Sequence, residues 1–365
     1  MIEIDGNQGE GGGQIVRTAL ALSTLTGQPF RVANIRKNRP QSGLKAQHLT
    51  AVEALKSICG ATTNPLSLGS TNLEYSPGKM KGGAYSFDIG TAGSITLLLQ
   101  ALLPPLLFAP KKVTLTLTGG TAGKWQAPVE YFQHVLLPQV QRFCTSITCT
   151  MNRRGYYPRG GGQVTLEVKP LLSLNHFDSF DLFLAELRKK VRSFELYEPG
   201  ELVQIKGTSH ASRQLMQRRV AERQADAARL ALQKYHVPVE IQSEYHDASS
   251  IGSGIALWAQ FTRHDEPYVF LGADALGEER KNAADVGSEA AGALMSEIDS
   301  GALVDVHLAD QLLPFMALAA PSKIKTSSVS EHARTNMDII EKFLPVTFEI
   351  VGNVICVHDT RGLSK

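Results

Sequence analysis

A glycine-rich run directly before an amphipathic helix constrains this chain more than any other feature. It reads DGNQGEGGGQIVRTALALS over Asp5–Ser23, and one carboxylate, Glu10, lies among its glycines. Glycine adopts positive φ and lets the backbone approach another group closely. The N-terminus of a helix adds unpaired N–H groups and a positive dipole end. The run therefore predicts an anion-binding loop or, alternatively, a purely structural tight turn. The carboxylate favours the first interpretation and makes Glu10 a candidate metal ligand.

The run matches neither of the common phosphate-binding motifs. No Gly-Lys-Ser/Thr follows the glycines as in a P-loop, and the spacing is not the GxGxxG of dinucleotide-binding folds. Arg17 follows Glu10 by two helical turns and lies on the same face, so its guanidinium could reach the same phosphate. The alternative is an arginine whose stem covers apolar surface while its head stays in solvent.

Composition bounds the kind of protein. With 365 residues, 43% of them apolar and 20% charged, the chain has room for two globular domains. A formal net charge of +2 excludes nonspecific polycation binding, so any nucleic-acid contact must come from a local patch. The longest apolar stretch, Ile95–Ala109, is too short for a membrane span and contains two prolines. No targeting segment is visible at the N-terminus, so we expect a cytoplasmic protein. The four cysteines lack zinc-site spacing.

A weak internal repeat runs through the chain. The helix-like segment Gly93–Pro105 is echoed by Leu308–Pro321. Three segments fit a second helix of such a unit: His48–Ile58, Tyr131–Phe143 and Asn336–Phe343. A glycine triplet also occurs twice, at Gly11–Gly13 and Gly160–Gly162. The pattern predicts a unit of two helices and a few strands used about three times. Chance similarity among apolar helices is the alternative.

The middle of the chain differs from both ends in its residue composition and in its pattern of predicted helices and strands. It carries a strand-like Leu202–Gly207, a strongly charged helix over Ser212–Tyr235 and then a glycine- and serine-rich turn before further strands. The repeat-like pattern resumes after Asn282 with a predicted helix, DVGSEAAGALMSEIDSG. We therefore expect an inserted smaller domain over 182–277, and a large domain made of 1–181 plus 278–365.

Seven segments, in this order, resemble the RNA 3′-terminal phosphate cyclase family. They are DGNQGEGGGQIVRTALALS, Gly43–Val52, Ile89–Pro104, Thr118–Thr121, Gly155–Gly162, His307–Ala319 and the region around His332. The resemblance is weakest in the middle block. It implies an α/β (α+β) fold in which the large domain holds three βαβαββ-type units, with a smaller α/β domain inserted after the second. It also implies an ATP-dependent conversion of an RNA 3′-phosphate end to a 2′,3′-cyclic phosphate, through a covalent histidine–AMP intermediate, with release of AMP and pyrophosphate.

The resemblance assigns His332 as the catalytic histidine that receives AMP. Glu331 and Ala333-Arg334 depart from the usual flanking pattern, while Thr335-Asn336 keep it. A neutral imidazole can attack phosphorus, and histidine is largely neutral near pH 7. The resemblance places the nucleotide against Gln100, Pro128, His307, Leu308, Ala309, Asp310 and Gln311. His307 stands where an aromatic ring often stacks on adenine, with Pro128 on the opposite face. Asp310 and Gln311 would bond ribose hydroxyls or orient the histidine; as helix-start residues they could equally be caps.

The same resemblance implies an RNA-phosphate site and a metal ligand. Residues expected to bind the terminal phosphate or its neighbour are Arg17, Arg36, Arg39, Gln47 and His48, with a solvated turn as the alternative for this cluster. Glu10 would hold Mg²⁺ or Mn²⁺ beside the phosphates of ATP, unless it only caps the first helix. In Arg39-Pro40-Gln41-Ser42-Gly43 the proline is displaced from its usual place before the glycine, which leaves the loop path open. The charged middle helix is interpreted as a solvated face, with RNA contact as the alternative.

Two rival functions are considered. One is a non-catalytic cyclase-like factor in ribosomal RNA processing, which His332 argues against because such relatives lack the nucleophile. The other is an enolpyruvyl transferase built from similar repeated units, whose lysines and arginines bind phosphoenolpyruvate. The GEGGGQ segment and the His307–Gln311 run fit the cyclase better. The expected partners are ATP and RNA with a 3′-phosphate end, without a membrane. The sequence leaves open the oligomeric state, the cellular RNAs and the role of the insert.

Overall fold

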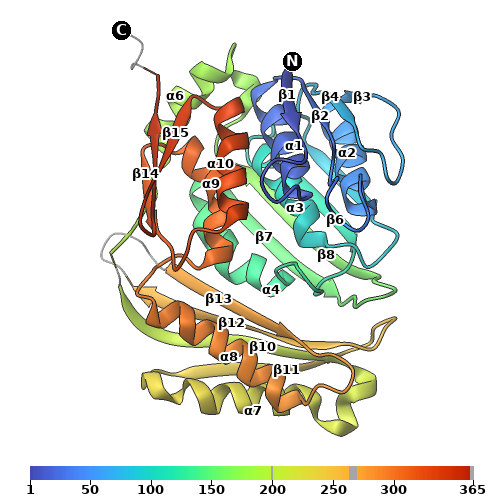
Figure 1. The fold of residues 1–365 in the computed structure, drawn as a ribbon, viewed down its shortest axis with the longest axis vertical. Helices are drawn as coiled ribbons and strands as arrows, with labels where there is room; N and C mark the ends of the chain where they lie inside the picture. Colours follow the sequence, from blue (N-terminus) through green and yellow to red (C-terminus); the bar gives the residue numbers. More distant parts are fainter. Residues whose placement is uncertain (199, 263–268, 362–365) are drawn as a thin grey trace.

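The computed structural model describes residues 1–198, 200–262 and 269–361 (Figure 1). Within these residues the chain forms four four-stranded sheets of mixed direction, each accompanied by helices. None of the described helices is long and apolar enough to cross a membrane.

The first unit is built as βαβαββ. Its elements are β1 (Ile2–Asp5), α1 (Gln14–Thr26), β2 (Phe30–Ala33), α2 (Ala46–Cys59), β3 (Thr62–Thr63) and β4 (Leu73–Ser76). The sheet order is β1-β2-β4-β3. The first two strands are parallel because α1 crosses over between them, whereas β4 runs antiparallel to both β2 and β3.

The second unit repeats this plan. Its elements are β5 (Gly83–Asp88), α3 (Ile95–Leu106), β6 (Val113–Gly119), the helical stretch α4 (Val129–Tyr131) to α5 (Leu137–Val140), β7 (Cys144–Arg153) and β8 (Gly162–Pro170). The third unit consists of β9 (Glu195–Leu196), α9 (Val306–Leu318), β14 (Ser322–Lys325), α10 (Glu331–Phe343), β15 (Val346–Val351) and β16 (Val354–Asp359). Their sheet orders, β5-β6-β8-β7 and β9-β14-β16-β15, match the first unit strand for strand.

The three-unit fold is therefore confirmed, and the predicted helix equivalences hold. The first helices of the second and third units, α3 and α9, are the two apolar segments that echo each other in sequence. Both are buried almost throughout, because α1 packs against α3 and α10, and α10 packs against α9. These helices form a shared layer between the sheets, and Figure 1 shows α1, α3, α9 and α10 gathered in the middle of the large body.

The glycine triplets, by contrast, do not mark equivalent positions. The first joins β1 to α1, whereas Gly160–Gly162 closes the hairpin between β7 and β8. Gly160 has φ +67°, and a Cβ there would lie 2.8 Å from Cα of Ala92. Close backbone approach explains this triplet, so its interpretation as part of the repeat is wrong.

The fourth sheet belongs to the insert. Its elements are β10 (Glu201–Ser212), α7 (Val220–Leu232), β11 (Val239–His246), β12 (Ser253–Thr262), β13 (Val269–Leu276) and α8 (Ala283–Asp299). The strand order is β11-β10-β12-β13, and α7 and α8 pack against each other and against the sheet. The opposite face meets the second unit, where the ring centroids of Trp258 and His134 are stacked 4.1 Å apart.

The boundaries of the insert differ from the predicted 182–277. The strand β9 pairs with β14 of the third unit, and α6 (Phe180–Lys190) packs on α9. At the other end, α8 packs on α7 and β13 rather than resuming the repeat. The insert unit thus spans 201–299 and interrupts the third repeat after its first strand. An apolar helix face indicates that the helix is buried but not which sheet covers it. The sequence therefore placed the α8 segment in the large domain, whereas α8 packs on the insert sheet. Independent folding of two domains stays a prediction.

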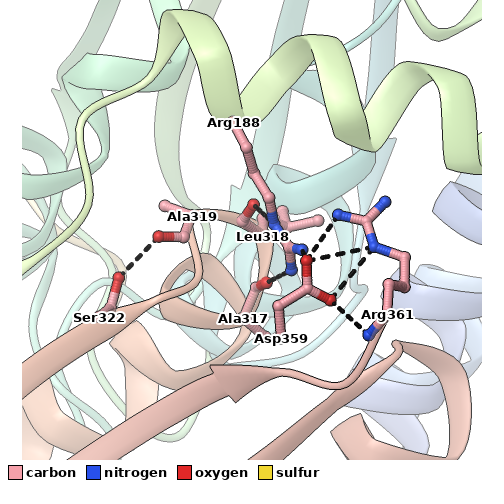
Figure 2. A network of polar contacts seen from close by, with 7 residues as sticks. All are labelled: Arg188, Ala317, Leu318, Ala319, Ser322, Asp359 and Arg361. Carbon is pink, nitrogen blue, oxygen red and sulfur yellow. Dashed lines mark hydrogen bonds and ion pairs between the residues drawn. The ribbon is translucent and has the colours of Figure 1, made fainter. Parts of the chain in front are cut away.

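Arg188 of α6 fixes the end of α9 (Figure 2). It donates from Nη2 to the carbonyl of Ala317 at 2.9 Å and from Nε to the carbonyl of Leu318 at 3.2 Å, and it pairs with Asp359 of β16. A helix leaves its last carbonyls unpaired and its C-terminal end partly negative, so a guanidinium satisfies both requirements. Burial alone would raise the pKa of Asp359, but bonds from Arg361 and the charge of Arg188 lower that pKa to about 2.

Replacing Arg188 with methionine should lower the free energy of unfolding by about 2–3 kcal/mol, because two carbonyls lose their donor. Urea unfolding of the variant measures the loss. Lys189→Met is the matched control, since that side chain is exposed and pairs only within α6. Equal stability of the two variants would show that the network contributes little.

Candidate functional site

His332 lies where the first and third units meet. It occupies the first turn of α10, whose N-cap Ser330 accepts a hydrogen bond from the Ala333 amide at 3.0 Å. Its ring contacts the glycine-rich run of the first unit on both sides. Nδ1 is 2.7 Å from Oε1 of Gln14, and Nε2 is 2.8 Å from Oε2 of Glu10. Two stretches more than 300 residues apart in sequence are thereby joined at one imidazole.

Both ring nitrogens of His332 face oxygen acceptors. A neutral imidazole carries only one N–H, so it can donate to only one of the two acceptors. A nucleophilic imidazole instead needs a free lone pair on one nitrogen. If Nδ1–H donates to Oε1 of Gln14, the lone pair of a neutral ring lies on Nε2, the nitrogen that faces Glu10.

Glu10 is shared between His332 and a basic residue. Its Oε2 also accepts a hydrogen bond from Nη2 of Arg39 at 3.1 Å. Gly12 lies beneath both partners, since a Cβ there would be 3.6 Å from Nη2 of Arg39 and 3.6 Å from Cε1 of His332. Gly9 has φ +54°, and a Cβ there would meet Oγ1 of Thr335 at 2.0 Å. Gly9 is therefore required where α10 packs directly on the backbone of the run.

A polar chain continues from His332 toward α9. Gln14 donates to the carboxylate of Asp310, which also accepts a bond from Asn336 at 3.3 Å. Thr18 in turn donates to Oδ1 of Asn336 at 2.7 Å. Burial raises the pKa of Asp310, while the charge of His332 and these bonds oppose the rise. The chain fixes the amide orientation of Gln14 and, through it, the plane of the His332 ring.

These residues line a small cavity between α1, α3 and α9. Its polar wall is formed by Gln14, Gln100, Asp310, Gln311 and Asn336, and its apolar wall includes Phe132 and Phe315. With about 40 Å³ it can hold ordered water but not a nucleotide. A nucleotide would therefore lie outside it, over His332 and the start of α9.

The remaining nucleotide candidates are divided by the structure. His307 is exposed at the start of α9, and Pro128 is buried as the N-cap of α4. Tyr131, one turn after Pro128, donates to Asp305, the N-cap of α9, at 2.7 Å, so the two helix starts lie together. Leu308 and Ala309 are different. Their side chains are buried in the core and their amides bond to Asp305, so the structure does not bring them to the site surface.

The basic candidates surround the glycine run. Nε of Arg17 donates to Oε1 of Gln100 at 3.0 Å, and burial lowers the pKa of Arg17 to about 10. His48 is buried, and burial, with the charges of Arg17 and Arg36, lowers its pKa to about 3. Its Nε2 has no partner in the described part of the chain. A Cβ on Gly13 would lie 2.3 Å from that nitrogen, so only glycine fits there.

Gln47 and Arg36 have structural bonds of their own. Gln47 accepts a bond from the Ser94 amide at 3.1 Å and so ties α2 to the loop before α3. Nη1 of Arg36 donates to the carbonyls of Gln41 and Gly43, which shapes the loop between β2 and α2. Only the other N–H groups of Arg36 are left for a phosphate, whereas Arg39 reaches the glycine run directly.

Sequence reasoning missed Gln14, Thr18 and Asn336 as members of the site. A signal was present: Gln14 and Thr18 are four residues apart on a helix face that is otherwise apolar. Buried polar side chains at such spacing need partners from elsewhere in the fold. Asn336 entered the sequence argument only as a marker of alignment.

The described residues contain no group of three or more His, Cys, Asp or Glu side chains placed to hold a metal. Glu10 stands as a single carboxylate beside an imidazole. Such a site suits an ion that takes most of its ligands from water and from phosphate oxygens, as Mg²⁺ does. It does not suit a structural metal.

Three βαβαββ units with an interrupting α/β unit, and a histidine–carboxylate–arginine cluster where two units meet, define a cyclase-like three-repeat protein. A sequence model for RNA 3′-terminal phosphate cyclase matches residues 8–350. The RNA 3′-terminal phosphate cyclase of Methanosarcina barkeri is 44% identical over 350 residues, 96% of each chain. The proteins of the same name from Archaeoglobus fulgidus and Pyrococcus furiosus are 43% and 41% identical, covering 98% and 100% of this chain and 100% and 99% of theirs. The chain belongs to the RNA 3′-terminal phosphate cyclase family.

Proposed function

We propose that the protein is an ATP-dependent RNA 3′-phosphate cyclase that works through a covalent His332–AMP intermediate. The observation that carries the proposal is the position of His332, whose two ring nitrogens are held between Gln14 and Glu10. Membership in the family supports the reaction class.

In the first step, Nε2 of His332 attacks the α-phosphorus of ATP. The N–P bond forms, the bond from the α-phosphorus to the bridging oxygen breaks, and pyrophosphate leaves. Gln14 holds Nδ1–H, so the lone pair on Nε2 is the one directed at the nucleotide. For Nδ1–H to bond to Gln14 while Nε2 attacks, the plane of the ring must be fixed. The hydrogen bonds from Gln14 and Asn336 to Asp310 would fix it.

In the second step, an oxygen of the RNA 3′-phosphate attacks the adenylyl phosphorus and His332 is released. The RNA end now carries AMP as a leaving group. The neighbouring ribose 2′-hydroxyl then attacks the 3′-phosphorus, loses its proton to solvent and expels AMP. Because the 2′-oxygen is already held beside its target, ring closure needs no external nucleophile.

Glu10 is the proposed ligand of a divalent ion, Mg²⁺ or Mn²⁺, when ATP is bound. Such an ion neutralises triphosphate charge beside the nucleophile. Glu10 would then turn from His332 toward the ion, which would leave Nε2 free. Arg39 would lose its carboxylate partner at the same time and could bind the RNA phosphate.

The nucleotide and the RNA end are assigned to neighbouring parts of one site, which meet where Arg17 donates to Gln100 at 3.0 Å. His307 and Pro128 would enclose adenine from the adjoining starts of α9 and α4, with Asp310, Gln311 and Gln100 near the ribose and phosphates. Arg17, Arg39, Gln47 and His48 would hold the RNA end, and His48 would act as a neutral group because its pKa is lowered to about 3.

The proposal is tested by incubating the protein with α-labelled ATP and magnesium. We expect label on the protein that survives alkali and is lost in acid, as for a phosphoramidate. Absence of label would favour the non-catalytic RNA-processing factor. Release of inorganic phosphate from phosphoenolpyruvate would favour the enolpyruvyl transferase.

Replacing Glu10 with glutamine should slow magnesium-dependent adenylation by about 100-fold while leaving RNA binding within about twofold, because one ligand is lost and no RNA contact is. Rates across a magnesium titration provide the measurement. Glu331→Gln is the matched control, since it removes the same charge from the residue next to His332. An unchanged magnesium dependence in the Glu10 variant would exclude the ligand role.

A further inference from the structure

The two most exposed large hydrophobic side chains of the described residues are both aromatic. Trp125 is 94% exposed and Tyr157 is 79% exposed. Trp125 lies in the loop from β6 to α4, and Tyr157 lies at the tip of the hairpin between β7 and β8. These segments are neighbours, because the Thr121 amide donates to the carbonyl of Gly155 at 3.0 Å. Single exposed apolar residues are ordinary, but two exposed aromatic residues on neighbouring segments are a surface feature.

Basic side chains accompany the two rings. Arg153 and Arg159 are exposed on the same hairpin. Nε of Arg153 donates to the carbonyl of Gly161, whereas the described residues give the Arg159 guanidinium no hydrogen bond or ion pair. Lys124 stands next to Trp125 and pairs with Glu278 of the insert at 3.0 Å. Aromatic faces with adjoining cations are the usual platform for unpaired nucleotides.

This platform is continuous with the RNA-end site. A Cβ on Gly160 would lie 2.6 Å from the carbonyl of Thr91, so the hairpin rests on the loop before α3. That loop is held to the other side by Ser94, whose amide donates to Gln47 at 3.1 Å. The loop 89–94 thus contacts Gln47, a residue assigned to the RNA end, on one side and the hairpin that carries Tyr157 on the other.

The platform also continues into the insert. The Arg159 amide donates to Oγ of Ser250 at 3.1 Å. Beyond this contact lies a cavity of about 610 Å³ between the starts of α7 and α8. Its cationic lining consists of Arg218, Arg223, Arg280 and Lys281, opposed by Glu278 and Glu279. Glu278 pairs with Lys124 and Lys281 pairs with Glu289, both partners lying outside the lining, so three arginines face one carboxylate and the cavity has a positive balance.

We propose that the single-stranded RNA preceding the 3′-phosphate crosses loop 89–94, stacks bases on Tyr157 and Trp125, and places backbone phosphates at the basic cavity of the insert. This path rests on the proposed function for its starting point. It gives the insert a role: to hold the body of the RNA while the large domain acts on its end. Stacking accepts any base, so the path predicts weak sequence preference.

The experiment compares a 12-nucleotide single-stranded RNA with a dinucleotide, both ending in a 3′-phosphate. Trp125→Ala and Tyr157→Ala should each raise the Kd of the longer RNA about 10-fold and leave the KM of the dinucleotide unchanged. Phenylalanine at either position should restore most of the binding, which excludes a folding defect. Leu68→Ala removes a similarly exposed side chain of the first unit and is the control.

Tryptophan fluorescence gives a readout that is independent of turnover. The other tryptophan, Trp258, is 7% exposed and stacked on His134, so RNA should quench mainly Trp125. The quench should vanish in Trp125→Phe. Arg218→Ala with Arg280→Ala should reduce the slope of log Kd against log salt by about 1.

The outcomes separate this path from the proposed reaction. If RNA quenched Trp125 fluorescence without ATP but the protein took up no AMP, the proposed RNA path would be supported and the proposed cyclase reaction would be excluded. Normal cyclisation with unchanged 12-nucleotide binding in the Trp125→Ala/Tyr157→Ala double variant would overturn the path. Equal losses for duplex and single-stranded RNA would also overturn it, because paired bases cannot stack on these rings.

Discussion

Replacing His332 with asparagine should remove AMP attachment and lower ATP-dependent cyclisation by at least about 1000-fold. Without the imidazole nitrogen no N–P bond can form, and nucleophile losses of this kind are large. Folding should be retained, because the His332 side chain is 44% exposed and asparagine can still bond to Gln14 or Glu10. Labelled-ATP uptake and cyclic-phosphate formation are the two measurements.

The His332 variant also separates the steps of the reaction. Given RNA that already carries AMP on its 3′-phosphate, it should still form the cyclic phosphate, since that step uses the 2′-hydroxyl. His358→Asn is the control, because His358 is an exposed histidine of β16 that pairs only with Glu349. Substantial AMP uptake by the His332 variant would place the nucleophile elsewhere.

The repeated fold could be predicted because its signal is local. The segments of α3 and α9 were identified as a pair because their sequences echo each other. What the sequence did not contain was the assignment of α8. Its apolar face is buried by α7 and the insert sheet, yet the same face would suit a repeat unit equally well. The boundary of the insert is set by tertiary packing, so it cannot be predicted from the sequence of α8 alone.

The site was predictable to the extent that its residues carry charge or unusual backbone demands. Glu10, Arg39 and His332 were all named, and the structure brings both Arg39 and His332 within hydrogen-bond distance of Glu10. The polar chain through Asn336 was not predicted, because a neutral amide within a helix gives no indication in the sequence of the distant residue to which it bonds. Leu308 and Ala309 also match the motif, but their side chains are buried in the core, so their place in a nucleotide site stays a prediction.

A buried ion pair of the second unit, next to its contact with the insert, should matter more for folding than any exposed charge. The Arg154 side chain is 2% exposed and pairs with Glu130, which is 5% exposed, and it also faces Glu244 of β11 at 3.7 Å. Beside it, Tyr156 bonds to Nδ1 of His210 on β10 at 2.8 Å. Burial alone would raise the pKa of Glu130, but Arg154 lowers it below its usual range.

Replacing Arg154 with methionine should therefore lower the free energy of unfolding by about 3–5 kcal/mol at neutral pH, because Glu130 is left as an uncompensated buried charge. The pKa of Glu130 should then lie above its unfolded value, so the variant should regain stability relative to wild type as the pH falls below that raised pKa. Adding Glu130→Gln should recover most of the loss.

Arg153→Met, an exposed neighbour on the same hairpin, should change stability by less than about 1 kcal/mol. Urea unfolding at pH 7.5 and 5.5 tests all four proteins. If the double variant were as unstable as Arg154→Met alone, the penalty would come from lost packing around the guanidinium rather than from the stranded carboxylate.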